Sequence, residues 1–331
     1  MPSPSSHHSL DSSPAELPTG HSSFHGRGVC VTGGAGFIGS HLVAELLARG
    51  ARVSAIDDLS NGSRGNLPAN AQQMRFVEGS ILDEAALDAA LAGVELVFHE
   101  AALASVPQSI EEPERYAAVN ALGTLRVIEA ARRHGVRRMI YAGSSSAYGD
   151  LEESPKIESM QTDPLSPYAA SKLAGEHFLR AAAHCSGLEA ATLRYFNVYG
   201  PRQRADSAYS AVIPRFIDAI RRGEPPVIFG SGAQTRDFVH VRDVVWANLL
   251  AGSSPRPLRG ESVNVASGRV VSLLELVKIL AALRGTSVIP RHEPARVGDI
   301  MHSAASIAAA EGLIGYAPRV ALEEGLGELA R

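Results

Sequence analysis

The sequence predicts an α/β fold, in which a doubly wound parallel sheet is joined to a smaller, discontinuous α/β domain. Two observations carry this prediction. From residue 28 to about residue 200, short apolar runs alternate with longer segments of helical periodicity. The first apolar run ends in a glycine-rich turn that leads directly into one of those helical segments. Alternation of this kind favours a parallel sheet that is covered by helices on both faces.

Seven short apolar runs are the predicted strands of the sheet. They span residues 28–32, 53–56, 75–77, 96–99, 139–142, 192–196 and 262–265. The segments between them have helical character, and the clearest are residues 38–49 and 113–134. In the first of these the apolar residues recur with a helical period, and Gly50 follows as a suitable C-cap.

The spacing of prolines divides the chain into two expected domains. Beyond Gly200, prolines interrupt short elements and the strand–helix rhythm changes. We expect a sheet domain over residues 27–201 and 238–269, and a second domain over residues 202–237 and 270–331. Residues 1–26 are rich in Ser, Pro and His, and we expect a disordered tail there, because so few apolar groups cannot offset the cost of ordering the segment.

Composition excludes several classes of function. The net charge of −4 gives no basic excess, so we expect no nucleic-acid partner. No apolar run approaches the roughly 18–20 residues of a membrane span, and the N-terminus lacks the apolar core of a signal peptide, so we expect a cytoplasmic protein with no membrane contact. Two cysteines without metal-ligand spacing predict neither a disulfide framework nor a metal site.

The first strand–helix turn has the glycine spacing of a phosphate-binding loop. Gly33, Gly36 and Gly39 form a GxxGxxG pattern. Glycines allow a tight turn and a close backbone approach to a pyrophosphate, which the N-terminus of the following helix attracts. Asp57 ends the second strand, where a carboxylate accepts hydrogen bonds from ribose hydroxyls and repels a 2′-phosphate. The combination predicts a Rossmann-type domain that binds NAD; Asp58 is either a second contact or a solvated turn residue.

Two further polar features predict a catalytic centre. Tyr168 and Lys172 follow Pro167 at the start of a helical segment, and a spacing of four places both on one helix face. A lysine ammonium beside a phenol lowers the tyrosine pKa, which suits Tyr168 to act as a base. A run of serines from Ser144 follows the fifth strand, where hydroxyl groups face the ligand crevice of such sheets.

Taken together, these motifs resemble the extended short-chain dehydrogenase/reductase family, and within it the UDP-sugar 4-epimerases. The resemblance covers about residues 28–325. It is specific because many separate motifs occur in order: TGGAGFIG, DDLSNG, HEAA, SSSAYG, the Tyr168–Lys172 pair, RYFN, RDF and RVGD.

The resemblance implies a role for each matching residue. Ser144, Tyr168 and Lys172 are the expected catalytic residues. The expected cofactor-binding residues are Gly33, Gly36, Phe37, Ile38, Gly39, Asp57, Asp58, Asn61, Gly62, Ser80, Ile81, Ala101, Ala102, Asn120, Tyr168, Lys172 and Tyr195. The expected substrate-binding residues are Ser105, Ser144, Ser145, Asn197, Arg236, Arg296, Asp299 and Ser303. Arg236 and Arg296 are expected to bind the UDP pyrophosphate, because a planar guanidinium can donate two hydrogen bonds to phosphate oxygens. The family also implies a homodimer formed through helices at about 113–134 and 168–184.

The sequence departs from the family pattern at two positions. Ser80 stands where the family often has an Asp that touches the adenine, and Glu100 stands where it often has Gln or Leu. Both changes concern expected cofactor contacts, and a buried Glu100 requires a partner. We expect neither change to touch the catalytic chemistry.

The implied activity is C4 epimerisation of a UDP-hexose or UDP-N-acetylhexosamine through a 4-keto intermediate. The Ser105–Ser109 segment resembles the substrate loop of enzymes that act on UDP-N-acetylhexosamines. Ser303 leaves room where glucose-restricted relatives carry a Tyr, and a roomier pocket rarely excludes the smaller sugar. A UDP-glucuronate 4-epimerase or decarboxylase remains an alternative. Ser145 and Ser146 stand where the related dehydratases have an Asp-Glu pair, so the acid and base for water elimination are missing and a dehydratase is disfavoured. An alternative of another class is a non-catalytic NAD(P)-binding sensor, although such proteins typically lose the Tyr–Lys pair.

Overall fold

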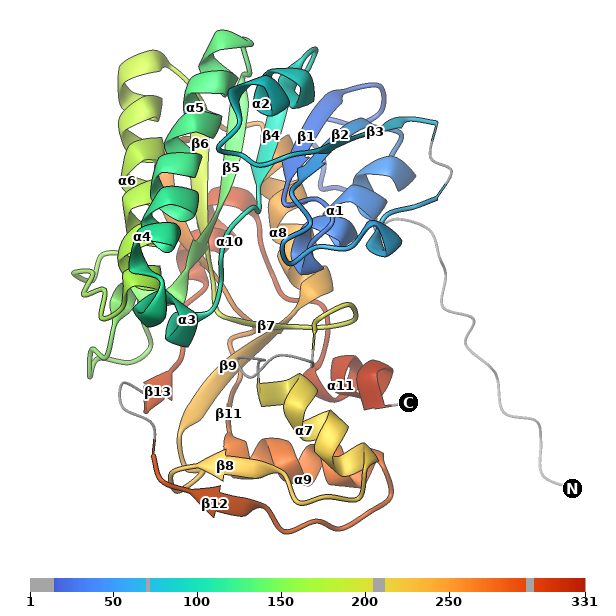
Figure 1. Ribbon diagram of the computed structural model, residues 1–331, viewed down its shortest axis with the longest axis vertical. Coiled ribbons are helices and arrows are strands. Elements are labelled where there is room, and N and C mark those ends of the chain that lie inside the picture. Colours follow the sequence, from blue (N-terminus) through green and yellow to red (C-terminus); the bar gives the residue numbers. More distant parts are fainter. Residues whose placement is uncertain (1–14, 70–71, 205–211, 296–300, 331) are drawn as a thin grey trace, which may run out of the picture.

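The structure is a computed structural model of the chain, and it describes residues 15–69, 72–204, 212–295 and 301–330 (Figure 1). Seven parallel strands form the main sheet, in the spatial order β10-β6-β5-β4-β1-β2-β3. Their bounds are β1 Gly28–Thr32, β2 Arg52–Asp57, β3 Met74–Glu78, β4 Leu96–His99, β5 Arg138–Ser144, β6 Glu189–Tyr195 and β10 Arg259–Val265. The predicted doubly wound parallel sheet is confirmed. Its order reverses between β1 and β4, which is where such sheets form a ligand crevice.

Helices cover both faces of this sheet (Figure 1). One face carries α1 (Phe37–Ala48), α8 (Val241–Ser253) and α10 (Ala308–Ile314), and the other carries α2 (Glu84–Leu91), α5 (Gly123–Arg133) and α6 (Pro167–Ser186). Side chains alternate between the two faces, so that Val29 and Val31 join the first layer while Cys30 joins the second. In the described part of the chain, none of the helices has the length and hydrophobicity needed to cross a membrane.

A second, smaller body lies beyond the carboxyl ends of the sheet strands (Figure 1). Its elements are β7 Asn197–Tyr199, α7 Val212–Arg221, β8 Val227–Phe229, β9 Thr235–His240, β11 Val270–Ser272, α9 Leu273–Leu283, β12 Arg291–Glu293, β13 His302–Ser303 and α11 Leu322–Ala330. Strand β9 pairs with β7, β11 and β13, and β12 pairs with β8. We predicted that β7 and the end of β9 belong to the sheet domain, but both strands belong to this second sheet. The chain returns to the sheet domain only with α8, and to the main sheet only with β10.

The N-terminal segment corrects a second expectation. Residues 1–14 lie outside the described residues, but residues 15–26 pack against the sheet domain. Phe24 is 1% exposed within the core beside α1. His21 Nδ1 lies 2.8 Å from Ser253 Oγ, and the Ser22 amide donates to the Ser253 carbonyl at 3.0 Å. The segment is therefore ordered, because it covers apolar surface at the end of α8.

The predicted helix over residues 113–134 is one continuous helical path with an irregular centre. It consists of α4 (Pro113–Tyr116), a π-helical segment (Ala117–Leu122) and α5. Directly before it lies α3 (Val106–Glu111), whose N-cap is Ser105. The wider π turn places Asn120 inside the protein, where it is fully buried.

Candidate active site

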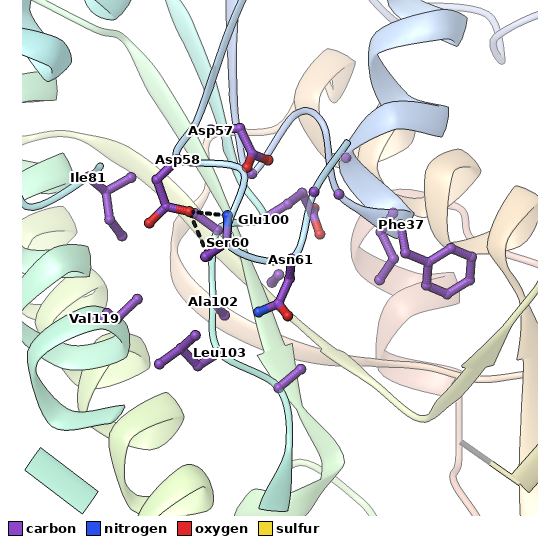
Figure 2. A pocket seen from close by; sticks show the side chains of 18 of the residues that line it. Phe37, Asp57, Asp58, Ser60, Asn61, Ile81, Glu100, Ala102, Leu103 and Val119 are labelled. Atoms are coloured by element: carbon purple, nitrogen blue, oxygen red, sulfur yellow. Dashed lines mark hydrogen bonds between the residues drawn. The ribbon is translucent and has the colours of Figure 1, made fainter. Parts of the chain in front are cut away.

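A cavity of about 1110 Å³ opens at the carboxyl ends of the parallel strands (Figure 2). The segments that follow β1, β2, β3, β4 and β7 contribute to its wall, together with the ends of β5 and β6 and the start of α6. Most of the predicted cofactor residues line it: Gly33, Gly36, Phe37, Ile38, Gly39, Asp57, Asp58, Asn61, Gly62, Ser80, Ile81, Ala101, Ala102, Tyr168, Lys172 and Tyr195. The structure thus brings together residues that are up to 162 positions apart (195 − 33) in the chain.

The backbone around the glycine loop leaves no room for a side chain at two of its glycines. Gly33 has φ +66°, and a Cβ there would lie 2.7 Å from the Ala101 amide nitrogen. A Cβ at Gly39 would lie 2.2 Å from the Gly33 carbonyl oxygen. Because the obstructing atoms are backbone, they cannot move aside. The loop therefore presents bare backbone and the N-terminus of α1 to the cavity, as a phosphate site requires.

Asp57 and Asp58 both line the cavity beside this loop (Figure 2). Asp57 accepts hydrogen bonds from the Ala35 amide at 3.0 Å and the Leu59 amide at 2.8 Å, so it ties the loop to the end of β2. Burial raises the pKa of Asp57, and those backbone bonds oppose the rise. Asp58 accepts from the amide and hydroxyl of Ser60 at 3.0 and 2.6 Å. Asp58 thus stabilises a turn and also lines the cavity. Its contact with the cofactor stays a prediction.

The predicted Tyr–Lys pair lies in the first two turns of α6. Ser166 caps this helix by accepting a hydrogen bond from the Ala169 amide at 3.1 Å. The Lys172 ammonium lies 4.4 Å from the centre of the Tyr141 ring. Burial lowers the pKa of Lys172 to about 8, and the charges of Glu100 and Glu176 oppose this change. The lysine is therefore held in a dry site in which neighbouring carboxylates decide how firmly it keeps its proton.

Ser144 joins Tyr168 from the neighbouring strand. It is the last residue of β5, and its Oγ accepts hydrogen bonds from the amide and hydroxyl of Ser146 at 3.2 and 2.8 Å. A hydrogen bond with Ser144 lowers the pKa of Tyr168, but burial raises it by more. The net pKa of Tyr168 is thus raised, against the expectation that Lys172 lowers it, because removing the phenol from water disfavours the phenolate.

Asn120 is the predicted cofactor residue whose position differs most from expectation. It does not belong to the cavity lining. Its side-chain oxygen accepts from the Leu103 amide at 2.8 Å, and its nitrogen donates to the Leu103 carbonyl and to Ser171 Oγ, each at 3.0 Å. Its amide therefore fixes one wall segment of the cavity against α6, from a position behind the described lining.

Ser80 also turns its hydroxyl toward the protein. Its Oγ accepts a hydrogen bond from the Leu82 amide at 3.2 Å, which supports the turn before α2. Ile81 and Val119 lie together on the wall across from Asn61 (Figure 2). Ile81 and Val119 make this part of the cavity apolar. It lies beside position 80, where the family often has an Asp.

The predicted substrate residues are more scattered. Ser105 lines the cavity, and its Oγ accepts from the Gln108 amide at 3.2 Å. Asn197 lies on β7 and donates to the Asp237 carbonyl at 3.0 Å, while Arg236 and Ser303 are direct neighbours in the pairing of β9 with β13. Ser144, Ser145 and these three residues are not part of the described cavity wall. Arg296 and Asp299 lie outside the described residues.

Several wall residues were not among the predicted site residues, although the change at Glu100 was expected to affect cofactor contacts. Glu100 follows β4, and its Oε1 accepts a hydrogen bond from Tyr195 at 2.8 Å. Arg202 follows β7 with φ +66°, and its Nη1 donates to Ser40 Oγ in the first turn of α1 at 3.1 Å. The rule that ligands bind at the carboxyl ends of parallel strands could have found Glu100. Arg202 lies in the loop after the sheet ends, where no periodic pattern marks it. The other unpredicted wall residues include Arg115, Tyr116, Val119, Gln203 and Arg204.

Comparison with known proteins agrees with this geometry. Residues 29–266 match the model of the "NAD dependent epimerase/dehydratase family". A UDP-glucose 4-epimerase of Mycolicibacterium smegmatis is 40% identical over 303 residues, which are 90% of this chain and 96% of that protein.

Solved structures agree as well. A UDP-N-acetylglucosamine 4-epimerase of Methanobrevibacter ruminantium, in complex with UDP-N-acetylmuramic acid, superposes with a TM-score of 0.88 at 39% identity, over 92% of this chain and 97% of that one. A UDP-glucuronic acid 4-epimerase of Bacillus cereus, with NAD and a fluorinated UDP-sugar, superposes with a TM-score of 0.85 at 30% identity, over 91% and 97%. The predicted family and the NAD cofactor are confirmed: the chain belongs to the NAD dependent epimerase/dehydratase family.

Proposed function

We propose that the protein catalyses the NAD-dependent epimerisation of C4 in a UDP-hexose or UDP-N-acetylhexosamine. The observation that carries the proposal is the meeting of Ser144, Tyr168 and Lys172, from β5 and α6, beside a cavity that the glycine loop also lines. Retention of all three residues argues against a non-catalytic sensor. The relatives described above act on UDP-sugars, and this supports the substrate class.

In the proposed reaction, Tyr168 removes the proton from the 4-hydroxyl, and Ser144 holds the same oxygen by a hydrogen bond. NAD, when bound beside the glycine loop, would supply the hydride acceptor for the C4 hydrogen and, once reduced, the donor of the same hydrogen. A 4-keto sugar forms, turns about the pyrophosphate linkage, and is reduced on its other face. Tyr168 then returns the proton to the 4-oxygen. Atoms balance, because both the proton and the C4 hydrogen are given back.

The charge of Lys172 bears directly on this step. Burial raises the pKa of Tyr168, so the phenolate needs a positive charge nearby. The Lys172 ammonium, one helical turn further along α6 and on the same cavity wall, is our candidate for that charge. Deprotonation of Lys172 would therefore weaken the base.

We further propose that the preferred sugar is UDP-N-acetylglucosamine or UDP-glucose, and that both are accepted. Ser105 caps α3 at the cavity wall, and Ser303 is a small side chain beside Arg236 on the second sheet. Together with Asn197, Arg296 and Asp299, these are the candidates for holding the UDP-sugar. UDP-glucuronate is the second candidate, because a similar structure is a UDP-glucuronic acid 4-epimerase and the Ser144–Ser146 hydroxyls could hold a carboxylate.

Product analysis tests this proposal. The purified protein is incubated separately with UDP-N-acetylglucosamine, UDP-glucose and UDP-glucuronate, with and without added NAD, and the products are followed by NMR. We expect the C4 epimer of at least one of the first two sugars. A pentose product from UDP-glucuronate would favour a decarboxylase, and binding of NAD without any product would favour the sensor.

We also propose that the protein forms a homodimer through α5 and α6. Leu122, directly before α5, and Phe178, on α6, are 45% and 38% exposed, so these helices present apolar side chains that a second copy of the chain could cover. Light scattering after gel filtration tests this. A mass near 34.9 kDa, that of one chain, would contradict it.

A further inference from the structure

Glu100 lines the same cavity as Tyr168 and Lys172, and Figure 2 shows it among the side chains of the cavity wall. It immediately follows His99, the last residue of β4, at the edge of the sheet where the strand order reverses. A carboxylate inside a largely buried wall is costly unless a hydrogen-bond donor and an opposite charge compensate it. Both kinds of partner are present.

A chain of hydrogen bonds fixes the Glu100 carboxylate. The Asn248 amide on α8 donates to the Tyr195 oxygen at 2.7 Å, and the Tyr195 hydroxyl donates to Glu100 Oε1 at 2.8 Å. Because the Tyr195 oxygen already accepts from Asn248, its single proton is directed at Glu100. Tyr195 is 7% exposed and Asn248 is fully buried, so this arrangement is held by the core.

The other carboxylate near Lys172 is already paired with a cation. Glu176 lies one turn further along α6, but Arg194 binds both of its oxygens, at 2.6 and 3.0 Å, and Ser262 donates to it at 2.8 Å. The Glu176 charge is therefore shared with a permanent cation. Glu100 accepts hydrogen bonds only from a neutral phenol among its described partners, so its charge is left to act on Lys172.

The remaining titratable groups around Glu100 do not compete for this role. The His99 ring contacts Thr32 and Thr124 at 2.6 and 2.9 Å, and burial lowers its pKa to about 3, so it is neutral near pH 7. Burial raises the pKa of Tyr195 well above its usual range, so it too is neutral. Asp57 accepts hydrogen bonds from the glycine loop and from its own turn, and Asp58 accepts them within that turn.

We infer that Glu100 is a positioning residue, which keeps Lys172 protonated by supplying a fixed negative charge on the same cavity wall. The inference deepens the proposed function, because a charged Lys172 supports Tyr168 as the base, but its test requires no turnover. Burial raises the pKa of Glu100 to about 7, while Tyr195 and Lys172 oppose the rise. Glu100 therefore gains its charge as the pH rises through about 7, and Lys172 loses its charge only as the pH rises through about 8.

The lysine content of the chain allows a direct test. There are three lysines, Lys156, Lys172 and Lys278. In cofactor-loaded protein with 13C-labelled lysine, the pH titration of each side chain can be followed by NMR, and the loss of one signal in Lys172→Arg assigns it. We expect Glu100→Gln, which keeps the size and an acceptor for Tyr195, to move the Lys172 midpoint about 1 pH unit lower. Lys156 and Lys278 should not change.

Two further variants sharpen the result. Tyr195→Phe removes a bond that favours ionised Glu100, so it should move the Lys172 midpoint in the same direction by a smaller amount. Glu224→Gln is the matched control, since Glu224 is exposed and paired with Arg222 away from the cavity. In active protein, the alkaline fall in kcat should follow the Lys172 midpoint.

Superimposed Lys172 titration curves in the wild type and in folded Glu100→Gln would overturn the inference. If Glu100→Gln does not fold, the same comparison with Tyr195→Phe decides. A shifted Lys172 midpoint in a protein that epimerises no sugar would leave the inference standing and remove the proposed function, so the two failures are distinguishable.

Discussion

At the scale of single residues, burial sets the chemistry of the cavity. It raises the pKa of Tyr168 and Glu100 and lowers that of Lys172. In each case the neutral form is favoured, because charge is costly away from water. The proposed base therefore depends on the few charges that remain nearby, and its strength is a property of the cavity rather than of Tyr168 alone.

Replacing the proposed base tests its role. Tyr168→Phe removes the hydroxyl and keeps the ring that packs edge-on against Tyr116. We expect turnover to fall by roughly 10²–10⁴-fold, as for the loss of a general base, while NAD remains bound. Epimer formation by NMR and cofactor content by absorbance provide the two measurements. Near-normal turnover would exclude Tyr168 as the base.

A single methyl group tests the phosphate loop. In Gly39→Ala, the new Cβ would meet the Gly33 carbonyl oxygen, which is backbone and cannot move aside. We expect NAD content to fall at least tenfold and stability to fall by about 1–3 kcal/mol. Gly312→Ala is the control, since a Cβ on that helical residue meets nothing within 4 Å and should be neutral or slightly stabilising. Equal cofactor content in both variants would contradict this account of the loop.

The sequence predicted those site residues that belong to local motifs. Gly33, Asp57 and the Tyr168–Lys172 pair are recognisable because their spacing follows from one turn or one helix. Asn120 was assigned to the cofactor because a motif does not reveal where an amide points. The role that we propose for Glu100 could not be predicted for a similar reason, since it depends on the side chains of Tyr195 on β6 and Asn248 on α8.

At the scale of elements, most strands and helices began and ended close to their predicted bounds. Strands β1 and β4 agree at both ends, because buried parallel strands are continuous apolar runs with clear polar boundaries. The π-helical segment within residues 113–134 was not predicted, because one extra residue in a turn leaves the helical pattern on either side intact. Short strands such as β7 and β13 carry too few residues to show a period.

The π-helical segment leads to a prediction about the cavity wall. Asn120→Ala would leave the Leu103 amide and carbonyl without their partners. We expect a loss of about 1–3 kcal/mol for each buried polar group left unpaired, measured by urea unfolding. Because Leu103 lines the cavity, NAD affinity should weaken as well. A destabilised variant with unchanged NAD affinity would show that the wall does not depend on Asn120.

At the scale of the whole molecule, topology was predictable and long-range contacts were not. The sheet order follows from alternating strands and helices, since crossover connections leave few alternatives. The order in residues 15–26 depends on Phe24 and on contacts with Ser253, about 230 positions away, and nothing in the local composition indicates them.

The N-terminal segment should therefore contribute to stability and not to chemistry. Phe24→Ala empties a fully buried site beside α1, and we expect a loss of about 3–5 kcal/mol in unfolding free energy. The cavity is lined by other elements, so turnover well below the melting temperature should stay near that of the wild type. His25→Ala, at an exposed neighbour, should cost much less. Equal stability of both variants would contradict the packing of this segment.

The central claim is that C4 is oxidised and then reduced by the same bound NAD, and isotope transfer tests it most directly. The UDP-sugar that the protein epimerises is supplied with deuterium at C4, and the product is analysed by NMR and mass spectrometry. The account predicts a C4 epimer that keeps its deuterium at C4. An epimer in which the deuterium has exchanged with solvent would contradict the account, because inversion would then proceed by loss of a proton from C4.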